Sequence, residues 1–263
     1  MLATMTKKSD DQHYGGRGDP ARSMALLWRD GDQPKGRGPK PGLTVDKIVT
    51  AAVEVADADG LAALSMRRVA ERLGVGTMSL YTYVPAKAEL VDLMYDTVCG
   101  EVAPEPARGW RSRLERIARA YLDTYRRHPW MLAVMANSRP PLGPNCIANY
   151  DHDLRAVDGI GLSDLEMDSV VAMIYIFVQG AARAAVEAAG SEQDTGVTDQ
   201  EWWSAYAPLL EKVFDAQRYS VAARVGAVAG ETYQSAYDPD HGFNFGLARL
   251  LDGVAELVRA RAG

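Results

Sequence analysis

Hydroxyl, aromatic and basic side chains are concentrated between residues 67 and 87, and their types suit contact with a nucleic acid. Serine, threonine and tyrosine hydroxyls can bond to phosphates and base edges, and a methionine or threonine methyl group can contact a thymine methyl. An arginine can reach a base edge or a phosphate, and a lysine at the start of a helix can bind a phosphate with the free amides of the first turn. The candidate contact residues are Arg67, Thr77, Met78, Ser79, Tyr81, Tyr83 and Lys87.

Two short helices must position these side chains. The pattern predicts one helix over 65–73 and a second over 77–83, joined by a turn in which Gly74 supplies a left-handed backbone. In a helix-turn-helix the first helix braces the second, whose N-terminal end enters the major groove of DNA. Leu80 and Val84 would then face the core behind the exposed residues. The alternative is that two short helices with a glycine turn are simply part of a helical bundle.

Helical periodicity extends to both sides of this pair. Thr44 is the predicted N-cap of a helix whose apolar residues recur at i, i+3, i+4 and i+7, and which ends at Asp59-Gly60. After Pro85 a further helix is predicted from Ala86 to about Gly100. Residues 44–100 are therefore predicted to form a helical head that reads DNA.

Charge is distributed unevenly along the chain. The whole sequence has a net charge of −6, whereas the segment 61–88 holds Arg67, Arg68, Arg72 and Lys87 against Glu71 alone. A local basic patch on an acidic body is typical of a site-specific binder rather than of a protein that coats nucleic acid.

Composition excludes several other classes of protein. No apolar stretch approaches the roughly 18 uncharged residues that cross a bilayer, and the N-terminal residues lack a secretory signal, so a cytoplasmic protein without a membrane partner is expected. The two cysteines, Cys99 and Cys146, have no C-x-x-C spacing and predict neither structural zinc nor a disulfide framework.

Outside the head, the sequence predicts a mobile arm and a helical body. Residues 1–43 contain many glycines, prolines and charges and predict a mobile arm, although the short apolar run at Met24–Trp28 could dock on the protein. Ala103-Pro104-Glu105-Pro106 marks the boundary between the head and a larger body. Helices are predicted in the body at about 110–128, 130–137, 144–159, 163–189, 200–219 and 243–261. We predict an all-α fold.

The head resembles the DNA-binding domain of the tetracycline-repressor (TetR) family. The residues that carry the resemblance are Ile48-Val49-x-Ala51-Ala52, Asp59-Gly60-Leu61, Leu64-Ser65-Met66-Arg67-Arg68-Val69-Ala70, Leu73-Gly74-Val75, Ser79-Leu80-Tyr81-x-Tyr83-Val84 and Lys87-x-x-Leu90. The resemblance implies a three-helix helix-turn-helix head whose DNA contacts fall on the candidate residues named above. It also implies a transcriptional repressor as the common mode, with activation as the alternative.

The body resembles the ligand-binding domain of the same family more weakly. The matching residues are Arg127-His128-Pro129-Trp130, Gly143-Pro144-Asn145, Gly161-Leu162-Ser163, Phe177-Val178-Gln179-Gly180 and Phe243-x-Phe245-Gly246-Leu247. The resemblance implies that residues 107–263 bind a small-molecule effector and form a homodimer through helices at about 163–189 and 243–261. The dimer would bind a pseudo-palindromic operator and leave it when the effector binds. The apolar stripe of the second helix is equally compatible with ordinary core.

The effector site is predicted among large or polar-tipped residues of the body, and the alternative for each is ordinary core packing. The candidates are Tyr125, Met131, Met135, Tyr150, Met173, Phe177 and Gln179. Gln179 interrupts an apolar run and is expected to be buried. Met135 stands where the tetracycline repressor has a magnesium-binding histidine, and a thioether is a poor magnesium ligand. No metal, no cofactor and no magnesium–tetracycline effector are therefore expected.

Two other readings compete with a DNA-binding regulator. An enzyme is one, because Asp151-His152-Asp153 and the group Asp238, Asp240 and His241 contain possible ligands, but neither has a strong metal spacing and no catalytic motif accompanies them. A purely structural helical module is the other. In the arm, Arg37 and Lys40 could follow the minor groove or could be solvated linker charges.

Overall fold

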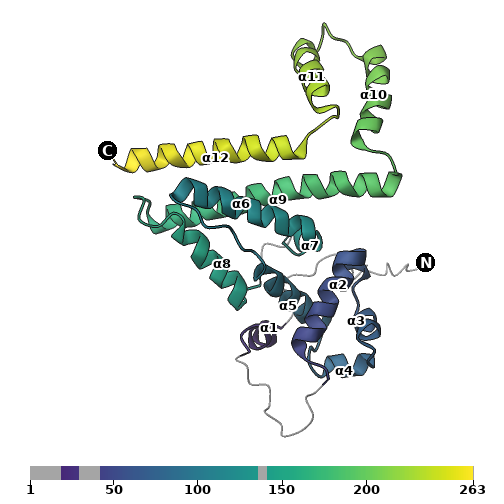
Figure 1. The fold of residues 1–263 in the computed structure, drawn as a ribbon, viewed down its shortest axis with the longest axis vertical. Helices are drawn as coiled ribbons and strands as arrows, with labels where there is room; N and C mark the ends of the chain where they lie inside the picture. Colours follow the sequence, from purple (N-terminus) through teal and green to yellow (C-terminus); the bar gives the residue numbers. More distant parts are fainter. Residues whose placement is uncertain (1–18, 30–41, 136–140, 263) are drawn as a thin grey trace, which may run out of the picture. The chain divides into compact units, whose positions relative to one another are not determined.

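A computed structural model describes residues 19–29, 42–135 and 141–262, and every regular element in these ranges is an α-helix (Figure 1). The predicted all-α fold is confirmed. The chain divides into two compact units, residues 1–171 and residues 172–263. Arg37 and Lys40 lie outside the described residues.

The first unit begins with the helices of the head and an additional helix before them. These helices are α1 (Pro20–Leu27), α2 (Val45–Ala63), α3 (Met66–Leu73), α4 (Thr77–Tyr81) and α5 (Lys87–Cys99). The Thr44 side chain accepts a hydrogen bond from the Lys47 amide at 3.2 Å, as predicted for an N-cap. The path of α2 is interrupted at Gly60, which has φ 78° and ψ 164°, so the predicted helix end at this glycine is also confirmed.

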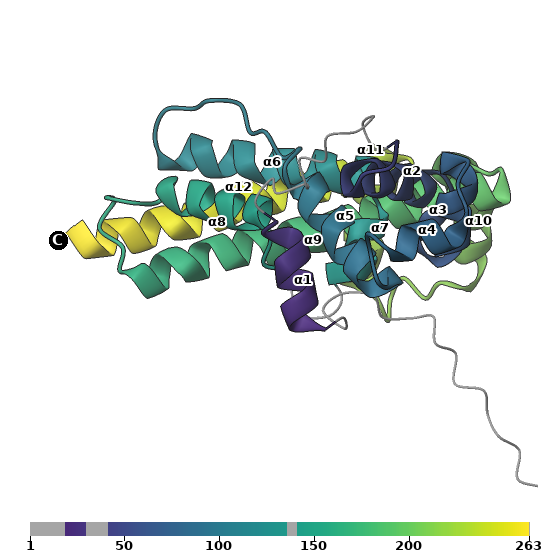
Figure 2. The same cartoon turned by 90° about the horizontal axis from the view of Figure 1, so that it is seen from below.

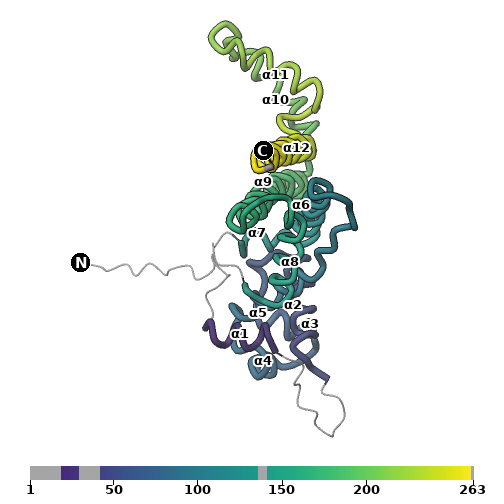
Figure 3. Tube along the Cα trace, turned by 90° about the vertical axis from the view of Figure 1, so that its left-hand side faces the viewer, coloured from purple at the N-terminus to yellow at the C-terminus, as the bar shows by residue number. Residues whose placement is uncertain are grey.

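Helix α5 connects the head to the remainder of the first unit. It packs against α1 and α2, and also against α7 (Trp130–Met135) and α8 (Pro144–Arg155). Figures 1 and 3 show α5 between α8 and the other helices of the head. The unit is completed by α6 (Trp110–Arg127) and by the first residues of α9 (Asp164–Thr195).

The second unit contains the rest of α9 and three further helices. These are α10 (Asp199–Val213), α11 (Ser220–Tyr233) and α12 (Pro239–Ala262). Helices α9 and α12 run side by side (Figures 1 and 2), and the Phe177 ring on α9 stacks on the Phe243 ring of α12 with a centroid separation of 5.8 Å. Helices α10 and α11 are described over their whole length, and neither contains a buried residue.

Three sequence expectations require correction. The arm is not irregular throughout, because Asp19 caps α1 and Pro20 occupies its first turn, a position where proline lacks no needed amide. The helix expected over 200–219 ends at Val213, and α11 was not predicted. Helix α12 begins at Pro239 rather than at residue 243, because Asp238 accepts hydrogen bonds from the amides of Asp240 and His241, both at 2.9 Å.

Candidate nucleic-acid interface

The turn between α3 and α4 is fixed by local hydrogen bonds and one glycine. The Ser65 side chain accepts from the Arg68 amide at 3.2 Å and starts α3. Gly74 ends it in the left-handed region at φ 66°, and the Val75 amide donates to the Ala70 carbonyl at 3.0 Å. Because other residues are strained at this φ, the glycine fixes the direction in which α4 leaves the turn.

Helix α4 presents one face outward and anchors the other. Leu80 and Val84 are fully buried, as predicted. On the opposite face Met78 is 77% exposed and Tyr81 is 42% exposed, so both large side chains project into solvent. Ser79 is also exposed, whereas Thr77 and Tyr83 are half-buried. The N-cap of the helix is Gly76, and the helix ends at Tyr81 rather than at the predicted residue 83.

The arginines of α3 already have carboxylate partners. Arg67 Nε donates to Glu71 Oε1 at 2.8 Å, and this hydrogen bond raises the pKa of the exposed Arg67 guanidinium. Arg68 pairs with Asp59 at 2.6 Å, and Arg72 pairs with Glu54 at 2.5 Å.

The expectation of a basic patch over 61–88 therefore overstated the positive charge, since Asp59 and Glu54 come from α2, outside that segment. What the head exposes on α4 is a face of hydroxyl, methionine and tyrosine side chains. Lys87, the first residue of α5, is half-buried. Such a face can donate hydrogen bonds and make apolar contacts.

Polar contacts join the head to the helices that follow it, and sequence analysis did not identify them. Asp57 of α2 accepts from Trp130 Nε1 at 2.7 Å and lies 2.8 Å from Nδ1 of the buried His128. Asp96 of α5, also buried, accepts from the Cys146 amide at the start of α8 at 2.9 Å. These partners are separated by about 50 to 70 residues in sequence, so no local sequence pattern predicts their contacts.

Helix α1 makes a similar connection. Ser23 Oγ donates to Asp92 of α5 at 2.9 Å, and Trp28 Nε1 donates to the Leu142 carbonyl at 2.8 Å. Arg29 forms an ion pair with Asp46 in the first turn of α2. The apolar run noted in the sequence therefore docks through its tryptophan.

The seven candidate effector residues divide between the two units. In the first, Tyr125 and Met131 are buried, Met135 is half-buried, and the exposed Tyr150 donates to Asp168 at 2.7 Å. In the second, the residues on α9 are half-buried, including Gln179, which was expected to be buried. These are Met173, Phe177 and Gln179.

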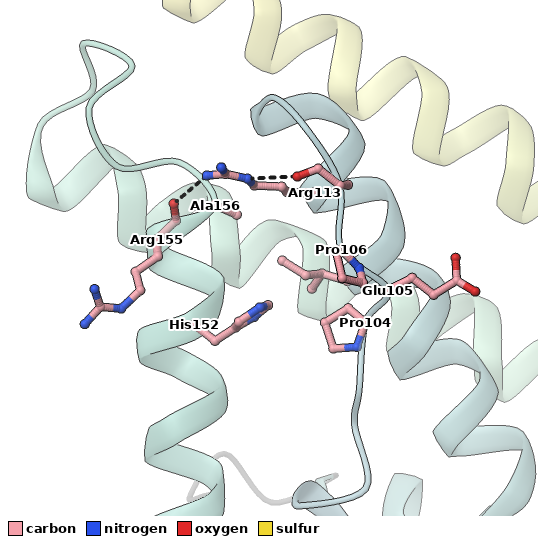
Figure 4. A pocket seen from close by; sticks show the side chains of 9 residues that line it. Pro104, Glu105, Pro106, Arg113, His152, Arg155 and Ala156 are labelled. Atoms are coloured by element: carbon pink, nitrogen blue, oxygen red, sulfur yellow. Dashed lines mark hydrogen bonds between the residues drawn. The ribbon is translucent and has the colours of Figure 1, made fainter.

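A cavity of about 320 Å³ lies elsewhere in the first unit (Figure 4). It is formed where the 104–107 segment faces α6 and α8, and Arg113 spans one side by donating to the carbonyls of Ala107 and Arg155, both at 3.4 Å. A neighbouring open cavity of about 630 Å³ is lined by residues that lie between Ala103 and Asp123 in the sequence. Neither is lined by any of the candidate effector residues.

The two acidic–histidine groups make contacts within the protein. Asp151 pairs with Arg155 at 2.7 Å, and the buried Asp153 accepts from Tyr121 at 3.1 Å and contacts His152 Nδ1 at 3.0 Å. Asp238 caps α12, as described above. Among the described residues, no group of three or more His, Cys, Asp or Glu side chains is arranged to hold a metal ion.

Comparison with known families matches both parts of the chain. Residues 48–94 match the family of bacterial regulatory proteins called tetR, and residues 103–258 match the tetracyclin repressor-like C-terminal domain. The chain belongs to the TetR family of transcriptional regulators. The segment matched by the N-terminal family contains α3, α4 and all the candidate DNA contacts.

Individual relatives agree with this assignment to the TetR family. The chain is 47% identical to the HTH-type transcriptional repressor DrrR1 of Streptomyces coeruleorubidus over 98% of its own length and 94% of that protein. Among solved structures it is similar to apo ActR of Streptomyces coelicolor, with 28% identity and a TM-score of 0.67 over 84% of this chain and 99% of ActR. ActR in complex with actinorhodin gives 30% identity and a TM-score of 0.66 over 82% and 97%.

Proposed function

We propose that this protein is a cytoplasmic, dimeric transcriptional repressor that binds a pseudo-palindromic operator and is released by a small-molecule effector. The observation that carries the proposal is the outward face of α4, held over the fully buried Leu80 and Val84. In the family this helix belongs to the helix-turn-helix. The similarity to a named repressor over nearly the whole chain supports repression rather than activation.

In this proposal α4 enters the major groove and α3 braces it. Met78, Ser79 and Tyr81 meet base edges, while Arg67 and Lys87 meet the phosphates or adjacent bases. Arg67 must exchange its bond to Glu71 for a bond to DNA, which places its contribution under the control of a neighbouring carboxylate. Thr77 and Tyr83 complete the set.

A second copy of the chain is proposed to cover the exposed apolar residues of α9 and α12. Ile176 is 72% exposed and Phe245 is 59% exposed, whereas Leu247 and Leu251 on another face of α12 are buried. By length and composition alone α9 could instead cross a membrane, but a single such helix is weak evidence. A dimer places its two heads in successive major grooves, about 34–36 Å apart.

The effector is proposed to act by changing how α5 lies against the helices behind it. Only a difference in its affinity for the two arrangements can shift the equilibrium between them. The hydrogen bonds of Asp57 and Asp96 are the contacts that such a change would have to break or reorganise. The similarity to ActR, solved with actinorhodin, supports a small molecule in the C-terminal domain. The candidate effector residues stay predictions.

The direct test is a titration of the purified protein on labelled DNA from upstream of its own gene, at fixed salt. Tyr81→Ala removes an exposed side chain of α4 and is expected to weaken binding about tenfold or more. Tyr219→Ala is the matched control, because Tyr219 is 47% exposed but lies outside the head. Equal affinity of the wild type and Tyr81→Ala would show that Tyr81 does not contact the DNA.

A further inference from the structure

The only two cysteines of the chain lie against each other. Cys99 is the last residue of α5 and Cys146 is in the first turn of α8, and their sulfur atoms are 3.0 Å apart. Both are free thiols. Since a disulfide has a sulfur–sulfur distance of about 2.05 Å, the two sulfurs need to approach by roughly 1 Å to form one.

The surrounding contacts hold the two helix ends together at this point. Asp96 accepts from the Cys146 amide at 2.9 Å and from Asn145 Nδ2 at 3.2 Å. From the other side, Asn149 Nδ2 donates to the Cys99 carbonyl at 2.7 Å. A side chain at Gly143 would collide with the Asp96 carboxylate, so the close approach of this carboxylate to the start of α8 requires the glycine. The thiols are therefore neighbours because the α5–α8 contact is built around them.

We propose that Cys99 and Cys146 form an oxidation site, at which hydrogen peroxide converts the thiol pair into an intramolecular disulfide that joins α5 to α8. Cys146 is half-buried and Cys99 is buried, so the oxidant reaches Cys146 first. The Cys146 thiolate attacks one peroxide oxygen, the O–O bond breaks, and the leaving hydroxide takes up the thiol proton as water. The Cys99 sulfur then attacks the resulting sulfenic acid, and a second water leaves with the Cys99 proton. Two thiols lose two electrons and two protons, and one peroxide becomes two waters.

The local environment makes this oxidation slow at neutral pH. The hydrogen bond to Cys99, burial and the nearby Asp96 carboxylate raise the pKa of the Cys146 thiol. The other titratable groups around the pair are Tyr95 on α5 and, beside it, Tyr125 on α6. Because the thiolate is the nucleophile, the reaction is expected to accelerate from neutral to alkaline pH.

The disulfide would connect the last helix of the head to a helix of the ligand-binding region. In the repressor proposed above, on which this consequence rests, the bond would limit the movement of α5 against α8 through which the effector acts. The oxidation site itself depends only on the two thiols and the α5–α8 contact, so it can fail or succeed independently of DNA binding.

The first measurement is the intact mass of the full-length protein after treatment with hydrogen peroxide, followed by alkylation of free thiols under denaturing conditions. We expect the monomer to lose the mass of two hydrogens, to accept no alkylating groups, and to regain two alkylation sites after reduction. Cys146→Ser and Cys99→Ser, treated in parallel, should not show this loss. Thiols that remain alkylatable, gain only oxygen atoms, or link separate chains would overturn the proposal.

The second measurement tests whether the bond ties the two helices together. Amide hydrogen exchange in the first turn of α8 should slow by about tenfold in the oxidised protein and recover on reduction. Peroxide-treated Cys146→Ser should exchange like the reduced wild type. A disulfide that forms without slowing this exchange would contradict the mechanical coupling of α5 and α8.

Discussion

The head and the α10–α11 segment are both helical, but only the head has a core of its own. Ile48, Val69, Leu80, Leu90 and Met94 are completely buried in the head. In α10 and α11, by contrast, Val213 is 80% exposed, Val221 is 65% exposed and Val228 is 63% exposed. Helical periodicity is therefore sufficient to form a helix in either place, but burial decides which segment is stable by itself.

The largest expected difference between the two regions concerns a buried charge. Leu80→Asp places a carboxylate in the closed core behind α4 and is expected to cost about 4 kcal/mol or more, enough to unfold the head. Val213→Asp, on α10, is the matched substitution and is expected to change stability by no more than about 0.5 kcal/mol. Thermal unfolding followed by circular dichroism, at equal chain concentrations, compares them. A loss for Val213→Asp as large as that for Leu80→Asp would mean that α10 is covered.

A smaller difference is expected when glycines in the two regions are replaced by alanine. Gly74→Ala forces a β-carbon into the left-handed turn at φ 66° and should destabilise the protein by roughly 1–2 kcal/mol. Gly226→Ala is in α11, where an added β-carbon meets nothing within 4 Å, and should stabilise its helix by about 0.5–1 kcal/mol. Urea unfolding of both variants measures the free energies. If both substitutions changed the free energy of unfolding in the same direction, the two glycines would not differ in backbone conformation as described.

The smallest change in stability is expected on the surface of α3. Glu71→Ala removes the partner of the exposed Arg67 and should leave the unfolding midpoint unchanged, because such exposed pairs contribute little. It should nevertheless raise affinity for operator DNA, since the guanidinium no longer has to leave a carboxylate. Titrations over a salt series measure this. Weaker binding by the variant would show that Glu71 positions Arg67 rather than competing for it.

Local sequence signals predicted the head well. The cap at Thr44, the turn at Gly74 and the buried Leu80 each depend on residues only a few positions away. The same signals did not predict α11, a helix rich in small residues such as Ala222 and Gly226.

Contacts between distant residues were not predictable from the pattern. Trp28 bonds to the Leu142 carbonyl 114 residues away, and Cys99 meets Cys146 across 47 residues. The ion pairs of Arg68 and Arg72 with α2 likewise depend on tertiary packing, and for this reason the charge count alone overstated the basic patch. The residues expected at the effector site were chosen by type, and type alone does not say which of them share a cavity.

In the proposed repressor, two copies of α4 read a pseudo-palindromic operator. Nuclease footprinting of the wild-type protein on DNA from upstream of its own gene tests it most directly, with Tyr81→Ala as the control. We expect a saturable protected region with two symmetry-related halves, spaced by one helical turn of DNA or a multiple of it, and its loss in the variant. Protection without sequence preference, or a footprint that Tyr81→Ala leaves unchanged, would show that α4 does not read an operator in this way.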